Sequence, residues 1–187
     1  ASELSWYGPS GLVVATESWG PADGTSTTPE RLTRTETDYD EAGRAIRTCA
    51  LLNPTGAVLS RTTPDASDPC SRTWYTRMGE IAATKDPKGN TILVSYDMVG
   101  RKHQVTDALQ NYVTYKYDNA GNVVQVDSHE LDAYTGAPHD YHTISTYDAL
   151  NRRKTTTVDP VLDTDPPGAA RLALSTSYEY DPRSNVT

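Results

Sequence analysis

Short stretches in which apolar and polar residues alternate recur along the chain and predict β-strands. Residues 91–96 are rich in β-branched and aromatic types, which favour a pleated surface. Since successive side chains of a strand point to opposite faces, we expect Ile92, Val94 and Tyr96 on one face. The matching positions of two later stretches are Val113, Tyr115, Tyr117, Thr176, Tyr178 and Tyr180. The best helix candidate, residues 29–34, is too short and too rich in Thr, so the pattern predicts an all-β fold.

A short motif, Tyr-Asp-x-x-Gly, follows these stretches and predicts a turn after each. Asp accepts hydrogen bonds from the next backbone amides, and Gly takes the positive φ that closes the loop. Asn151 replaces Gly in one copy and suits the same conformation, while residues 74–80 form a degenerate copy without Asp. The motif residues are Tyr39, Asp40, Gly43, Tyr96, Asp97, Gly100, Tyr117, Asp118, Gly121, Tyr147, Asp148, Tyr180 and Asp181.

The spacing of the motif predicts tandem antiparallel β-hairpins that form one curved, continuous sheet. Tyr75, Tyr96 and Tyr117 follow one another at intervals of 21 residues. A second turn segment, Asp-Pro-Lys-Gly-Asn at 86–90, recurs in altered form at 107–111. Stacked hairpins would align the motif tyrosines into an aromatic ladder, in which cross-strand pairs contribute roughly 0.2–1 kcal/mol each.

Longer intervals between the other copies indicate loop insertions near residues 53–70, 131–140 and 161–169, where Pro and Gly gather. We therefore expect about six repeats over residues 35–187. Residues 1–34 are expected to be a divergent repeat or an N-terminal cap.

Composition supports a sheet that is partly hydrated. The chain has 12 Tyr and 3 Trp but no Phe, so much of its apolar surface carries polar groups that need partners when buried. The net charge of −8 argues against a nucleic-acid partner, which would require a basic patch. No apolar run approaches the roughly 18 residues that span a bilayer. The first residues lack a signal peptide and a Met, so we expect a piece of a longer protein.

The two cysteines, Cys49 and Cys70, leave two alternatives open. They form a disulfide if the chain lives in an oxidising compartment, and otherwise remain two separate thiols. Two cysteines are too few for a disulfide framework or a zinc site. We expect no cofactor, and no metal site, because His139 and His142 at spacing i, i+3 on a strand would point to opposite faces. We also expect no catalytic residue, because each Asp of the motif occupies the same turn position in every copy.

The repeated unit, Tyr-Asp-x-x-Gly-Arg followed by a return strand and Asp-x-x-Gly-Asn, resembles the YD or Rhs repeat. The likeness covers roughly residues 35–187 and is clearest at 84–127. The family includes Rhs polymorphic toxins, the cage component of insecticidal toxin complexes, wall-associated bacterial proteins and teneurins. It implies hairpins added side by side into a hollow, β-solenoid-like shell. Residues 165–169, Asp-Pro-Pro-Gly-Ala, depart from the family's self-cleavage segment in lacking the final Leu and are interpreted as a loop.

The resemblance implies a structural segment of a shell that encloses or presents a toxin or effector cargo. An extracellular carbohydrate-binding or adhesion module is the alternative, because tyrosine columns beside Asp and Asn suit glycans. A glycoside hydrolase would need two carboxylates about one sugar bond, and no pair stands out, so we expect no enzyme. The expected partners are neighbouring repeats of the same or a longer chain, further copies joined through sheet edges, toxin cargo or glycans. The expected location is secreted or on a bacterial cell surface, as part of a larger exported protein.

Overall fold

The computed structural model describes residues 2–21, 30–51, 63–64, 68–132, 134–160 and 173–186 of the 187-residue chain. Within these ranges every regular element is a β-strand, which confirms the prediction of an all-β fold. A search of the same ranges finds no helix that is long and apolar enough to cross a membrane. The chain divides into two compact units, Ala1–Thr91 and Ile92–Thr187.

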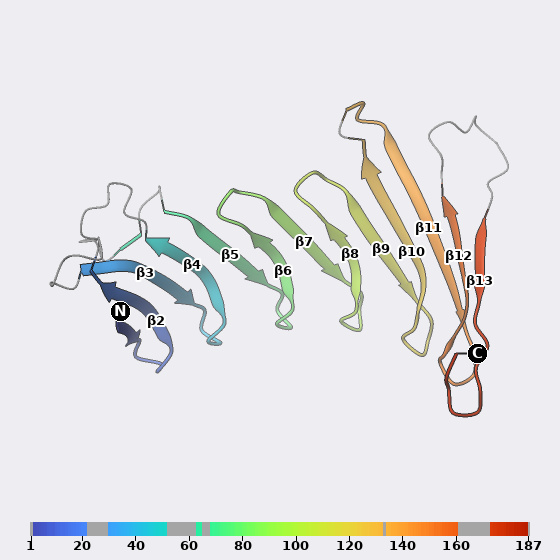
Figure 1. The fold of residues 1–187 in the computed structure, drawn as a ribbon, viewed down its shortest axis with the longest axis horizontal. Helices are drawn as coiled ribbons and strands as arrows, with labels where there is room; N and C mark the ends of the chain where they lie inside the picture. Colours follow the sequence, from blue (N-terminus) through green and yellow to red (C-terminus); the bar gives the residue numbers. More distant parts are fainter. Residues whose placement is uncertain are drawn as a thin grey trace. The chain divides into compact units, whose positions relative to one another are not determined.

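The first unit is a run of antiparallel strands in which each strand pairs with the next along the chain (Figure 1). This order needs only short connections and gives successive hairpins. Its strands are β1 (Ser2–Tyr7), β2 (Val13–Gly20), β3 (Glu30–Tyr39), β4 (Ala45–Leu51), β5 (Cys70–Tyr75) and β6 (Ile81–Lys85).

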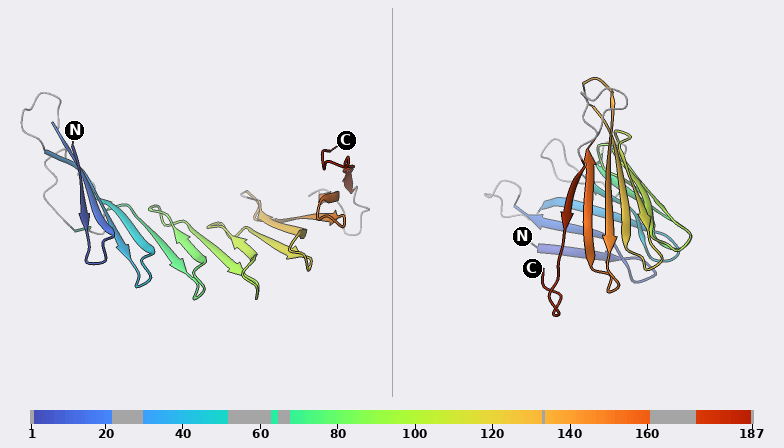
Figure 2. Two further views of the ribbon diagram at one scale, coloured as in Figure 1. Left: turned by 90° about the horizontal axis from the view of Figure 1, so that it is seen from below. Right: turned by 90° about the vertical axis from the view of Figure 1, so that its right-hand side faces the viewer.

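The second unit repeats this architecture, as the views in Figure 1 and Figure 2 show. Its strands are β7 (Thr91–Tyr96), β8 (Lys102–Thr106), β9 (Tyr112–Tyr117), β10 (Val123–Leu131), β11 (Pro138–Tyr147), β12 (Arg153–Pro160) and β13 (Leu174–Ser177). The stretches at 91–96 and 112–117 are therefore β7 and β9, and both pair with β8. The predicted tandem hairpins are thus present in both units.

Very little apolar surface is fully buried in the described part of the chain. The buried hydrophobic residues there are Ala15, Cys49 and Leu51. Large side chains such as Met98 and Val99 are exposed. Because burial of apolar surface is small, backbone pairing and the contacts at the hairpin ends must supply much of the stability.

A disulfide joins Cys49 of β4 to Cys70 of β5, so the bridged alternative holds in the structure. The two residues are direct cross-strand partners, with their Cα atoms 4.1 Å apart. Cys49 is fully buried and packs with Leu51 and Cys70. The bridge therefore fixes the strand pair that flanks the predicted insertion at 53–70, most of which lies outside the described residues.

The second predicted insertion, at residues 131–140, lies at the end of the β10–β11 hairpin. Leu131 ends β10 and Pro138 begins β11, so the insertion mainly lengthens a hairpin around a turn at 132–137. Asp132 Oδ1 accepts the backbone N–H groups of Tyr134 and Thr135, which organises this turn. Pro is tolerated as the first residue of a strand, so Pro138 does not prevent pairing. The insertion near 161–169 lies outside the described residues.

The expected boundary between residues 34 and 35 falls inside β3, which pairs with β2 on one side and β4 on the other. Residues 2–20 form a hairpin of their own, β1–β2. The N-terminal segment therefore continues the antiparallel order of the first unit.

Replacing both Cys49 and Cys70 by Ser is expected to lower the free energy of unfolding by about 3 kcal/mol, because the bridge restricts the unfolded chain. Urea unfolding followed by circular dichroism measures the change. A reductant should destabilise the wild-type chain to a similar extent and leave the double variant unaffected. If the reductant leaves the urea midpoint of the wild type unchanged, the prediction is contradicted.

Candidate functional site

The hairpin turns at the ends of the motif strands share one backbone geometry. The N–H of the first turn residue donates to the carbonyl of the fifth, and the N–H of the fourth donates to the carbonyl of the first. This is a type I turn followed by a residue of positive φ. At the ends of the motif strands these turns are 8–12, 40–44, 76–80, 97–101, 118–122, 148–152 and 181–185.

Positive φ at the fourth turn residue explains the motif glycine. Gly43 and Gly100 have φ of 77° and 83°, in the left-handed region that favours Gly. Asn151 has φ of 60°, as predicted for the Asn substitute, and Ser184 has φ of 65° in the last copy.

The motif aspartate holds the turn together from within. In the copy at 97–101, Asp97 Oδ1 accepts the N–H groups of Val99 and Arg101 at 3.0 and 2.9 Å. Its Oδ2 accepts Arg101 Nε at 2.7 Å. The hydrogen bond from the Arg101 amide is the largest influence, and with the other contacts it outweighs desolvation and lowers the pKa of Asp97 from its ordinary 3.8. The carboxylate is therefore committed to the turn.

The other motif aspartates repeat these contacts with either Arg or Asn at the fifth position. Asp148 binds Arg152 in the same way, and Asp118 binds Asn122 through both its amide and its side chain. The pKa values of Asp40, Asp118, Asp148 and Asp181 are all lowered. The five motif aspartates therefore share one structural role, which is to hold their own turns.

The degenerate copy at 76–80 keeps the turn by exchanging its polar groups. Thr76 Oγ1 accepts the N–H groups of Met78 and Glu80, each at 3.2 Å. The Thr76 hydroxyl in turn donates to the Glu80 carboxylate, and this bond lowers the pKa of Glu80. The acidic residue of this copy is therefore the fifth turn residue, Glu80, and not the first. The absence of Asp in the sequence did not indicate this exchange.

The motif tyrosine connects each hairpin to the one before it. Its hydroxyl donates to the main-chain carbonyl of the residue that follows the preceding turn. Tyr117 reaches Lys102 O at 2.8 Å and Tyr147 reaches Val123 O at 2.9 Å. Further bonds of this kind run from Tyr39 to Val13, from Tyr75 to Ala45 and from Tyr180 to Arg153.

The fifth turn residue completes this connection, which we call the interlock: the motif Tyr, its carbonyl acceptor and the fifth residue of the preceding turn. The guanidinium of Arg101 lies over the ring of Tyr117, 4.3 Å from its centroid. Arg44 covers Tyr75 and Arg152 covers Tyr180 in the same way. Where Asn122 stands instead of Arg, its Nδ2 donates to Asn151 Oδ1 of the next turn at 3.0 Å.

The predicted tyrosine ladder is wrong in its contacts. Equivalent tyrosines such as Tyr117 and Tyr147 are separated by an intervening strand, so they stand roughly 10 Å apart. Among the described residues the stacked aromatic pair is Tyr112 with His129, not two motif tyrosines. Arginine instead covers the rings of Tyr75, Tyr117 and Tyr180, and Asn122 stands at the corresponding position before Tyr147.

The sequence motif missed the hairpin at 2–20. Tyr7 pairs with Val13 across the turn, as Tyr39 pairs with Ala45, but Gly8 stands where Asp is expected. Gly11 has the positive φ of the fourth residue, and Val13 accepts the hydroxyl of Tyr39. The Tyr-x-x-x-Gly spacing shared by Tyr7 and Tyr39 was the available signal.

The turns at 86–90 and 107–111, at the other ends of the strands, use the same geometry. Asp86 and Asp107 each accept the amide and side chain of the Asn four residues on. Gln110 occupies the fourth position with φ of 70°, although a Gln side chain disfavours that region.

Two reciprocal His–Asp pairs join β10 and β11, and sequence reasoning did not find them. Asp127 Oδ1 lies 2.7 Å from His142 Nδ1, and His129 Nδ1 lies 2.5 Å from Asp140 Oδ1. Each pair is a direct cross-strand pair, so the repeated Asp-x-His at 127–129 and 140–142 was the signal. In the described residues no three His, Cys, Asp or Glu side chains converge on a metal-sized site.

Comparisons with known proteins give no family for this chain. No protein-family model matches the sequence, and no curated protein matches it. The solved structures similar to it include TcdB2-TccC3-Cdc42, at 11% identity and a TM-score of 0.40, and TcdB2-TccC3 without the hypervariable C-terminal region, at 12% identity and a TM-score of 0.34. The matches cover 98% and 99% of this chain but only 12% and 14% of those chains. At these scores the likeness identifies neither a family nor an activity.

Replacing Tyr117 by Phe is expected to lower the free energy of unfolding by about 1 kcal/mol, because the Lys102 carbonyl loses its donor. Urea unfolding measures the difference. Tyr134→Phe is the matched control, because that side chain is fully exposed and should tolerate the change. Equal effects of the two substitutions would show that the interlock hydroxyl contributes nothing.

Replacing Gln110 by Gly is expected to raise the free energy of unfolding by about 1 kcal/mol, because Gly adopts positive φ without steric cost. Gly121→Ala should lower it by a similar amount. An added Cβ at Gly121 meets no atom within 4 Å, so a loss there reports the strain of positive φ and not a steric clash. Urea unfolding of both variants measures whether the free energy of unfolding rises in Gln110→Gly and falls in Gly121→Ala. A change in the same direction in both variants would contradict the claim that positive φ at the fourth turn residue favours Gly.

Acid is expected to destabilise the chain through its turn aspartates. Their folded pKa values are lowered, so the stability they contribute is present above the unfolded pKa near 3.8 and is lost as pH falls through the folded values. Thermal unfolding between pH 2 and 7 should show this loss below about pH 4. The Asp97→Asn variant should lose less thermal stability than the wild type as the pH falls below about 4. An equal loss in the two proteins would contradict the role given to Asp97.

Proposed function

We propose that this chain is a structural segment of a YD/Rhs-type β-sheet wall that encloses or presents a toxin or effector cargo. The interlock carries the proposal. It repeats from hairpin to hairpin and uses the polar groups of the motif for contacts within and between turns. A wall of this kind acts by steric enclosure, and its partners are neighbouring repeats and the cargo.

The small buried core supports the same role. Ala15, Cys49 and Leu51 are the buried hydrophobic residues of the described chain, which leaves large apolar side chains such as Leu93 and Ile144 exposed. A sheet stabilised along its own plane keeps both faces available, one toward a cargo and the other toward solvent. A globular enzyme would bury much more apolar surface about one centre.

Cryo-electron microscopy of the complete natural polypeptide that carries this chain tests the proposal. The sheet should surround additional protein density, and a protease should spare that density. A multiple variant with Phe at Tyr39, Tyr75, Tyr117 and Tyr147 should open the wall and expose the enclosed protein to the protease. A sheet with solvent on both faces, or an enclosed protein digested equally in both forms, would refute the proposal.

We also propose that the chain performs no catalysis. The aspartates of the motif are held by their own turns, as Asp97 and Asp118 show, so none is free to act as acid or base. A panel of aryl glycosides and esters, incubated with the purified chain, should react at the rate of the buffer alone. A rate above buffer that is lost in a single-residue variant would overturn this proposal.

Export from the cell is the location we propose. The Cys49–Cys70 bridge supports it, because disulfides persist in oxidising compartments. Mass spectrometry of native material, alkylated before reduction, should find both cysteines protected. Free thiols in that material would speak against export.

Glycan binding is a second candidate, favoured by a hollow of about 980 Å³ over β1, β2 and β3. Trp6 and Tyr7 line it and are 52% and 66% exposed. At its base the buried Glu17 accepts hydrogen bonds from Arg31 Nη1 at 2.7 Å and from Arg34 Nη1. Burial raises the pKa of Glu17, but these bonds and one from Trp19 outweigh it, so the net pKa is lowered. Exposed aromatic rings beside fixed polar groups suit sugar rings.

A glycan array probed with the folded chain tests this second candidate. Binding should disappear in Trp6→Ala and persist in Tyr134→Ala, which removes an exposed aromatic ring outside the hollow. No binding by the wild type, or equal loss in both variants, would remove the candidate.

A further inference from the structure

A row of three cationic side chains crosses the first unit from β4 to β6. Arg47 is the cross-strand partner of Arg72, and Arg72 is the cross-strand partner of Lys85. Direct partners project from the same face of a sheet, so the three cations are neighbours on one face. Strand spacing separates each from the next by about 5 Å at the backbone.

This arrangement is unfavourable for the chain alone. Like charges placed directly opposite on neighbouring strands are destabilising. Asp38 compensates Arg47, with Oδ2 2.7 Å from Arg47 Nε. In the described part of the chain no acidic group lies within ion-pair distance of Arg72 or Lys85. A chain with a net charge of −8 has thus gathered cations at one place and left part of their charge uncompensated.

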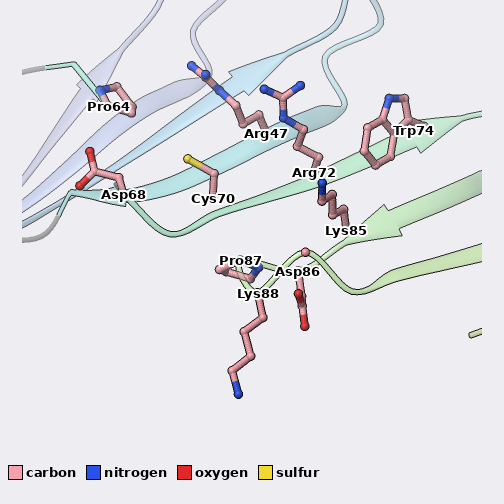
Figure 3. Close-up of a pocket in the computed structure, with 11 residues that line it drawn as sticks. Arg47, Pro64, Asp68, Cys70, Arg72, Trp74, Lys85, Asp86, Pro87 and Lys88 are labelled. Atoms are coloured by element: carbon pink, nitrogen blue, oxygen red, sulfur yellow. The ribbon is translucent and has the colours of Figure 1, made fainter. Parts of the chain in front are cut away.

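The row borders a hollow of about 610 Å³, which Figure 3 shows and which the carboxylates of Asp68 and Asp86 also line. Asp86 is held by its own turn, where its Oδ2 accepts Asn90 Nδ2 at 2.7 Å. Arg47, Arg72 and Trp74 extend from β4 and β5 toward the same side, whereas Lys88 points the other way. Trp74 is 44% exposed, and its cross-strand partner is the small Ala83. The indole ring therefore stands open beside the two guanidinium groups.

We infer that this hollow is a binding site for a small molecule that carries an oxyanion group on an aromatic or sugar ring. A guanidinium binds a carboxylate, sulfate or phosphate through two parallel hydrogen bonds, and Lys85 adds a point charge beside Arg72. Trp74 supplies the surface on which an aromatic or sugar ring stacks. The volume is that of a small-molecule site. The surrounding acidic chain repels long polyanions, which selects against nucleic acid.

The bound anion would remove the repulsion that the row creates. Arg72 and Lys85 gain their missing partner, while Asp38 keeps Arg47 in place. Binding is therefore expected to stabilise the folded chain and to weaken as ionic strength rises. This site is separate from the interlock and from the proposed wall function, since its residues make none of the tyrosine contacts.

Calorimetric titration of the purified chain with phenyl phosphate, glucose 6-sulfate, inorganic phosphate and glucose tests the inference at low ionic strength. The two ring-bearing anions should bind, and the tighter one identifies the ring that Trp74 prefers. Inorganic phosphate should bind at least tenfold more weakly, and glucose should not bind. Failure of both ring-bearing anions at millimolar concentration, or glucose binding equally well, would overturn the inference.

Titration of single-residue variants tests whether the named residues bind the anion. Arg72→Gln and Lys85→Gln should each weaken the ring-bearing anion at least tenfold, and Trp74→Leu should reduce its advantage over inorganic phosphate. Lys102→Gln is the matched control, because it removes the same charge outside the hollow and should leave binding unchanged. Without ligand, Arg72→Gln should unfold at a higher temperature than wild type, which separates lost binding from lost folding. Equal weakening by Lys102→Gln would show nonspecific charge attraction and refute the site.

Discussion

A tyrosine hydroxyl that reaches back to a carbonyl of the preceding hairpin is the contact on which this sheet depends. Strand pairing alone leaves hairpin ends free to fray, and the described chain has almost no buried core to restrain them. The bond from Tyr117 to Lys102 O, with Arg101 over the ring, ties two hairpin ends together. Asp97 then holds Arg101, so turn, ring and neighbouring strand stabilise one another.

The hairpins could be predicted from sequence because their signals are local. Alternation within residues 91–96 gave a strand, and Asp-x-x-Gly gave a turn whose geometry the structure reproduces. The partner of each tyrosine could not be predicted in this way, since it lies on the neighbouring strand of the preceding hairpin, about 15 to 30 residues earlier in the chain. Aromatic residues in register suggested ring-to-ring contact, whereas the distance across two strands favours an arginine between them. Polar substitutes such as Thr76 with Glu80 keep the geometry but hide it from a motif.

The electrostatics of the chain follow from the same turns. Aspartates outnumber glutamates among the acidic residues, yet those of the motif are held locally by hydrogen bonds from amides, Arg or Asn, as Asp97 and Asp118 show. The overall charge therefore says little about any one face. On β4, β5 and β6 the strands carry cations in register, and only Arg47 has an acidic partner among the described residues. Local register, which composition cannot reveal, decides where a charged ligand meets the sheet.

The tyrosine bond also constrains how such a chain can lengthen or shorten in evolution. Each motif tyrosine reaches a carbonyl on the neighbouring strand of the preceding hairpin, and every complete hairpin provides such a carbonyl. Duplicating or deleting a whole hairpin at the gene level leaves an acceptor for the next tyrosine and preserves strand direction. Gain or loss of a single strand would reverse the direction of all that follow and break the contact. Recombination between copies is thus tolerated in units of the hairpin, as in other arrays whose units touch only their neighbours.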